Sequence, residues 1–144
     1  MKRGLLFFSV ICVSFSMSGA RAQTDDEVSA RKTVLDLAGA FSNDGFKVRD
    51  GHWSGIVKPH ETKIVAVNLY AGNQYWFSVG ATTKAKKISV EVYDESGERV
   101  VTEKYEAGEK AAAGFSAGHS GQYYVSLGLI EGEPTSFCLV YSYK

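Results

Sequence analysis

From about residue 63 to the C-terminus, apolar and polar residues alternate in short runs, and this pattern constrains the fold more than any other feature. Alternation with a period of two is typical of half-buried strands. Short strands at regular spacing, separated by turn residues, favour an antiparallel sandwich or barrel. We therefore expect a mainly β protein, a jelly-roll-like antiparallel β-sandwich of seven to eight strands. The runs that predict it are 63–69, 75–79, 88–92, 99–105, 111–117, 123–129 and 137–143.

One phase of this alternation predicts the inter-sheet core, which comprises Tyr75, Phe77, Val90, Val92, Tyr123, Val125 and Leu139. The opposite phase points Trp76 and Tyr124 outward. These two residues hold matching places in two similar segments, 74–80 and 122–128, so they would lie close together if the two strands were neighbours. Aromatic rings supply large contact area at low entropic cost. We identify Trp76 and Tyr124 as candidate residues for binding a ligand or partner.

An amphipathic helix is predicted over residues 25–41. Thr24 and Glu27 have the spacing of a capping box, and the acidic first turn suits the positive end of the helix dipole. A helix of this length is marginal in water unless its apolar stripe is buried. The alternative to a binding role for Trp76 is therefore that the helix covers it. The stripe that would do so contains Val28, Leu35, Ala38 and Phe41.

The first 22 residues have the three parts of a secretory signal peptide: a basic start, an apolar run and the small-residue site Ala20–Ala22. We expect cleavage after Ala22, and hence a secreted or periplasmic protein with no transmembrane segment after cleavage. The predicted organisation is a signal peptide at 1–22, an N-terminal helix and turn at 23–45, and a sandwich domain at 46–144. Cleavage leaves 13 basic and 16 acidic residues, a net charge of −3, which disfavours nucleic acid as a partner.

Two motifs resemble catalytic signatures but lack the structural context that the chemistry requires. Residues 114–118 match G-x-S-x-G around Ser116, yet a nucleophile elbow needs a strand turning into a helix, and another strand is predicted here. His60 and Glu61 begin an H-E-x-x-H pattern that ends in Ile64, in a segment that runs into a strand. We therefore predict no catalytic residues and expect that the protein is not an enzyme.

The sequence also predicts no metal site. His52, His60 and His119 are expected in turns as solvated residues. Oxygen-bearing turns such as Asp94–Gly97 leave calcium open as the alternative to having no cofactor, although none has the spacing of a calcium loop. Cys138 alternates with Phe137 and Leu139, so we expect an inert thiol that faces away from the main core.

Four segments of the chain resemble the bacterial pre-peptidase C-terminal domain. They are 71–77 (AGNQYWF), 90–97 (VEVYDESG), 120–125 (SGQYYV) and 137–141 (FCLVY), and the similarity covers roughly residues 60–143. The resemblance implies a small extracellular β-sandwich, usually appended to secreted hydrolases, non-catalytic, and used for binding or secretion. No peptidase domain accompanies it in this chain.

These observations together predict a secreted, non-catalytic binding or accessory module whose partner is a protein or a polysaccharide outside the cytoplasm. The alternative is a structural or assembly protein of the cell envelope, in which the helix and the sandwich mediate self-association.

Overall fold

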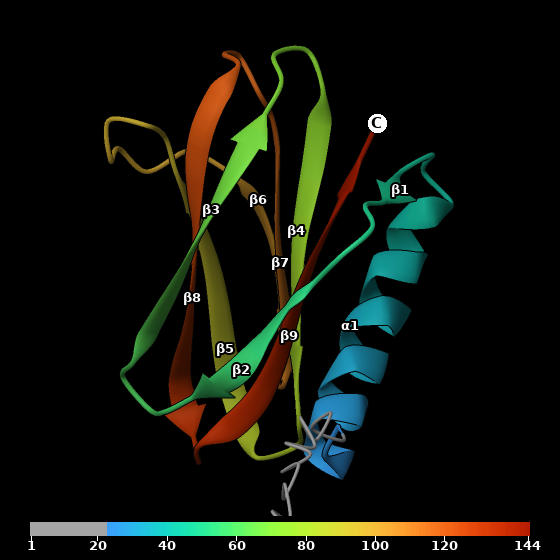
Figure 1. The fold of residues 1–144 in the computed structure, drawn as a ribbon, viewed down its shortest axis with the longest axis vertical. Helices are drawn as coiled ribbons and strands as arrows, with labels where there is room; N and C mark the ends of the chain where they lie inside the picture. Colours follow the sequence, from blue (N-terminus) through green and yellow to red (C-terminus); the bar gives the residue numbers. More distant parts are fainter. Residues whose placement is uncertain (1–22) are drawn as a thin grey trace, which may run out of the picture.

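The computed structural model describes residues 23–144, so the predicted signal peptide lies outside the described residues. Two antiparallel sheets face each other, and one helix lies on the outer side of the larger sheet (Figure 1). The sheets, here called sheet A and sheet B, have the orders β1-β9-β4-β7-β6 and β3-β8-β5, and β2 also pairs with β9 in sheet A. The elements are α1 (Asp25–Ser42), β1 (Lys47–Val48), β2 (Trp53–Val57), β3 (Thr62–Leu69), β4 (Gln74–Ala81), β5 (Ala85–Tyr93), β6 (Glu103–Ala107), β7 (Lys110–Ser116), β8 (Gly121–Gly132) and β9 (Thr135–Tyr143).

The predicted fold class is confirmed, with nine strands in place of seven or eight. The additional strands are β1 and β2, which both pair with the C-terminal strand β9. Their short or glycine-containing sequences carry no clear alternation, so long-range pairing with β9 creates them. The predicted run 99–105 is wrong in its first half. The strand there begins at Glu103, and Arg99 makes only an isolated bridge to Tyr93.

The core between the sheets consists of the residues that the alternation predicts. Tyr75, Phe77, Val90, Val92, Tyr123, Val125 and Leu139 are all buried in one cluster. Aromatic rings from sheet A contact one another within it, with the Phe77 and Tyr141 centroids 5.2 Å apart. Burial of these side chains is the main stabilising contribution to a domain that has no internal disulfide among its described residues.

The helix begins as predicted. The Thr24 side chain accepts from the Glu27 N–H at 3.2 Å, and the Glu27 carboxylate accepts from the Thr24 N–H at 3.1 Å. These reciprocal bonds satisfy donors that the first helical turn leaves free. The structure places the end of α1 at Ser42, one residue beyond the expected bound.

α1 packs on the outer face of sheet A through only part of the predicted stripe: Ala38 is buried and Phe41 stacks on Trp76, as expected. Val28 and Leu35 are 52% and 43% exposed, so their assignment to the buried face is wrong. A second buried cluster instead joins the helix to β9 and contains Ala30, Val34, Ala38, Cys138 and Val140. Next to Ala30 and Val34 the helix approaches the sheet too closely for large side chains, and these two small side chains fit there.

Gly80 on β4 makes this close approach possible. A Cβ atom at this position would lie 2.5 Å from the Val34 backbone nitrogen and 2.8 Å from the Ala30 carbonyl oxygen. Both are backbone atoms, so no side-chain rotation would relieve the overlap. The absence of a side chain at Gly80 therefore fixes how deeply the helix sits on the sheet.

Candidate binding site

The structure separates the two residues that the sequence identifies as a binding pair. Trp76 lies on β4 of sheet A and Tyr124 on β8 of sheet B, so the idea that they are neighbours is wrong. Both point outward from the core, as expected, but from opposite sides of the sandwich. A similar local sequence gave them equivalent places in two different sheets.

Trp76 is covered by the helix. Its ring stacks on Phe41 of α1 with centroids 4.3 Å apart and planes inclined by 10°. On the strand side it fills the space above Gly114, where a Cβ atom would lie 2.5 Å from the indole. Trp76 thus anchors the C-terminal half of α1. Its surroundings match the alternative in which the helix covers this residue.

Tyr124 lies on the outer face of sheet B, where its cross-strand partners are Ala66 on β3 and Tyr93 on β5. Its hydroxyl donates to the Gln122 side-chain oxygen at 3.0 Å. The exposed Ile64 and Ile130 belong to the same outward phase of the sheet. This face therefore presents a mixed aromatic and aliphatic surface.

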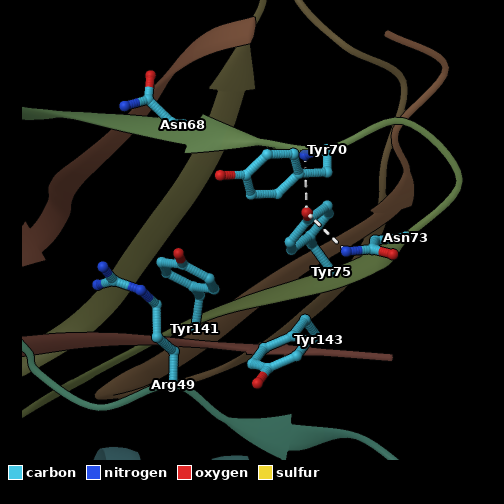
Figure 2. Close-up of a pocket in the computed structure, with 7 residues that line it drawn as sticks. All are labelled: Arg49, Asn68, Tyr70, Asn73, Tyr75, Tyr141 and Tyr143. Atoms are coloured by element: carbon cyan, nitrogen blue, oxygen red, sulfur yellow. Dashed lines mark hydrogen bonds between the residues drawn. The ribbon is translucent and has the colours of Figure 1, made fainter. Parts of the chain in front are cut away.

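A different group of aromatic residues lines a hollow between the two sheets, which we call the tyrosine cleft. Sheet B ends at β3 on this side, so no further strand covers the tyrosines that face inward from β4 and β9. The cleft has a volume of about 260 Å³ and adjoins a second hollow of about 380 Å³ that shares four of its residues. Figure 2 shows the lining residues, which are Arg49, Asn68, Tyr70, Asn73, Tyr75, Tyr141 and Tyr143.

Hydrogen bonds and ring contacts hold the floor of the tyrosine cleft in place. The Tyr75 hydroxyl accepts from the Tyr70 backbone N–H at 2.9 Å and from the Asn73 side-chain amide at 3.2 Å (Figure 2). Tyr75 and Tyr141 meet edge to face at 6.1 Å. Since Tyr75 is also part of the buried core, the floor is a continuation of the core and is rigid before any ligand arrives.

The rim of the cleft is exposed and aromatic. Tyr70 follows β3 and is 66% exposed, and Tyr143 near the C-terminus is 38% exposed. Both carry a ring and a hydroxyl that can donate and accept. A rigid floor with an accessible aromatic rim is typical of ligand-binding sites.

Arg49 brings a positive charge to the cleft. Its backbone N–H donates to the Tyr141 carbonyl oxygen at 2.9 Å, and its guanidinium carbon lies 5.3 Å from the centre of the Tyr141 ring. Burial raises the pKa of Tyr141, while the Arg49 charge opposes that rise. The net direction is upward, so the Tyr141 hydroxyl keeps its proton at neutral pH.

The serine of the G-x-S-x-G segment lies at the end of β7. Ser116 pairs with Gln74 of β4, and the chain continues through a short loop into β8. Gly114 of the same motif lies beneath Trp76. The structure therefore assigns these glycines to strand packing and loop geometry, and not to a strand-to-helix elbow.

His60 occupies the turn before β3, with a positive φ of 61° and its N–H donating to the Leu129 carbonyl at 3.0 Å. Glu61 contacts Lys63 at 2.5 Å, and hydrogen bonding to Lys63 and to the Lys58 backbone lowers the pKa of Glu61. Within residues 23–144, no three His, Cys, Asp or Glu side chains gather as a metal-binding group.

Asp94 organises the hairpin turn that the sequence left open to calcium. One of its carboxylate oxygens accepts from the Ser96 hydroxyl at 2.7 Å, the Ser96 N–H at 3.0 Å and the Glu98 N–H at 2.9 Å. These hydrogen bonds lower the pKa of Asp94. Turn formation thus accounts for the aspartate at this position.

Cys138 faces away from the inter-sheet core, as predicted, and is buried beneath α1. Burial raises the pKa of the thiol, although the Ser54 side chain and the Arg31 charge oppose this. The sequence showed no basic residue near Cys138, and it is the packing of the helix that brings Arg31 towards it.

No pattern in the sequence marked Arg49, Tyr70, Tyr141 or Tyr143 as site residues. Tyr141 and Tyr143 lie on the same face of the last strand. This spacing is only a weak indication of a binding site, because the residues on that face also form the core. Only the pairing of β1 and β9, with β3 at the facing edge, brings the four residues to one place.

We compared the chain with models of known protein families and with curated proteins, and neither comparison gives a match. Nothing in the described residues combines the length and the hydrophobicity that a membrane-spanning helix requires.

Proposed function

We propose that this protein is a secreted, non-catalytic binding module, and that the tyrosine cleft is its binding site. The observation that supports the proposal is the cleft itself, in which exposed rings at Tyr70 and Tyr143 surround a floor that is continuous with the core. The partner is a protein or a carbohydrate outside the cytoplasm. A non-catalytic binding role is also what the resemblance to the pre-peptidase C-terminal domain implies.

Rigidity is the physical reason to assign binding to this cleft. A ligand that enters it need not order Tyr75 or Tyr141, because packing and hydrogen bonds already hold both side chains. Less conformational entropy is then lost on association. Trp76 cannot offer the same surface, since Phe41 already covers its ring.

Residues 23–144, labelled with ¹⁵N, provide the test. We expect that a panel of neutral oligosaccharides, acidic oligosaccharides and proline-rich peptides will contain a ligand that shifts the amide signals of residues 68–75 and 141–144. Tyr70→Ala and Tyr143→Ala should weaken that binding about tenfold or more, as expected for aromatic hot-spot residues. Tyr105→Ala, at an exposed tyrosine on β6, is the matched control and should bind normally.

Shifts that map to the outer face of sheet B, with the cleft unaffected, would refute the assignment of the site. A covalent change in the ligand during the titration would refute the non-catalytic role.

The assembly alternative has its own supporting observation, the exposed Ile64 and Ile130 on the outer face of sheet B. Under that alternative, copies of the chain associate through this face and Ile64→Glu makes them monomeric. Sedimentation velocity across a hundredfold concentration range distinguishes the two functions, because a binding module with a free cleft needs no self-association.

A further inference from the structure

The tyrosine cleft carries one unneutralised charge. Among the described residues that line the cleft and its adjoining hollow, Arg49 is the only charged one, and none of them is a carboxylate. None of the ion pairs between residues 23 and 144 involves Arg49. Its neighbour Asp50 offers the guanidinium only a backbone carbonyl, at 3.4 Å.

An arginine beside an aromatic floor is suited to a planar anion. The guanidinium presents its N–H groups in a fixed fork that matches a carboxylate through two parallel hydrogen bonds. Its contact with the Tyr141 ring and the backbone hydrogen bond of Arg49 to the same residue limit the positions that it can take. The charge is therefore held at one end of the cleft, with the other tyrosines beside it (Figure 2).

The remaining groups of the cleft suit a sugar ring. Tyr70 and Tyr143 offer ring surfaces for the C–H faces of a pyranose, and their hydroxyls can donate and accept as sugar hydroxyls do. An extended peptide would instead need free backbone groups along the strand edge. The edge of β3 offers such groups, since β3 pairs only with β8, so an acidic peptide is the competing ligand that the test includes.

We propose that the tyrosine cleft binds a carboxylate-bearing sugar, a uronic acid residue within an acidic polysaccharide. In this complex Arg49 binds the carboxylate, and Tyr70 and Tyr143 contact the ring. The inference rests on the proposed binding function and specifies its ligand. It also predicts that salt weakens binding, because one charge pair forms at a partly open site.

The experiment uses residues 23–144 and four probes: tetragalacturonate, its fully methyl-esterified form, cellotetraose and an acidic proline-rich peptide. The ester keeps the sugar rings but removes the charges, so it isolates the contribution of the carboxylate. Titration calorimetry gives affinities, and ¹⁵N spectra locate the bound ligand. We expect tetragalacturonate to bind in the cleft at least tenfold more tightly than its ester or cellotetraose.

The variants isolate Arg49. Arg49→Gln should weaken tetragalacturonate binding about 10- to 100-fold, the range expected for a charge-assisted hydrogen-bonded pair. Arg49→Lys keeps the charge without the fork and should lose less. Arg99→Gln, at an exposed arginine beyond the β5 turn, is the matched control and should bind normally. Amide spectra of the free variants confirm that each one is folded.

Equal binding of the acid and its ester, or full affinity in Arg49→Gln, overturns this inference and leaves the binding function standing. Cleft binding of the peptide alone has the same consequence. If no probe shifts the cleft amides while another ligand binds elsewhere on the protein, both this inference and the assignment of the site fail.

Discussion

Replacing Gly80 with alanine tests whether the close packing of α1 on sheet A depends on the absence of a side chain at this one position. The new Cβ would lie 2.5 Å from the Val34 nitrogen, whereas ordinary contact begins at 3.4 Å. The helix and the strand must therefore separate by about 0.9 Å. Since backbone lies on the helix side of the contact, the whole helix has to move.

Two opposing effects give the magnitude. Glycine to alanine restricts the unfolded chain, which stabilises the protein by about 0.4–1 kcal/mol. Overpacking at a close interface costs about 1–3 kcal/mol. We expect a net loss of roughly 1–2 kcal/mol, and for a domain of this size that lowers Tm by roughly 3–10 °C.

The assay combines thermal unfolding with tryptophan fluorescence. Trp76 reports on the helix because Phe41 stacks on it, and a Trp53→Phe background removes the second indole. Gly80→Ala should red-shift the emission and lower Tm. Gly118→Ala, where a Cβ atom meets nothing within 4 Å, is the matched control and should leave both values near those of the parent.

A Gly80→Ala protein that is as stable as the Gly118→Ala protein, with unchanged Trp76 emission, would refute the close-approach argument. The helix would then tolerate a side chain beneath it, and its depth on the sheet would have another cause.

Burial and the sequence lead to four other predictions. Phe77→Ala should cost about 3–5 kcal/mol in chemical denaturation, because the ring is fully buried, and Tyr105→Ala should cost under about 1 kcal/mol; similar values for the two would contradict the core register. The Cys138 thiol should react with Ellman's reagent far more slowly in the folded than in the unfolded protein. Because burial raises the pKa of Cys138 above its ordinary 9.0, the unfolded chain loses the proton first. Stability should therefore decline above about pH 9 more steeply than in Cys138→Ala, and parallel pH profiles would exclude this linkage. The exported protein should begin at Gln23, which its intact mass would show, whereas a retained Met1 would contradict cleavage.

The elements of this fold depend on local patterns that the sequence displays directly. Period-two alternation depends on each strand having one buried face, so the inward phase of β4, β5, β8 and β9 was predictable residue by residue. The start of the helix was predictable for a similar reason, since Thr24 and Glu27 satisfy each other's backbone groups within one turn. The sequence alone therefore predicted the fold class, which the structure confirms. It also predicts a secreted or periplasmic location, which stays a prediction.

Tertiary structure decided which surfaces face each other. Alternation places Trp76 and Tyr124 outward but cannot say that they belong to different sheets, because strand order depends on pairing between distant segments. The buried face of the helix depended on Gly80, a residue of another element. The tyrosine cleft arises because sheet B stops at β3 while β1 and β9 bring Arg49 and two tyrosines beside that edge. The hydrophobic periodicity of each segment predicts its secondary structure. The cleft forms only where distant segments come together, and long-range strand pairing and packing determine where that is.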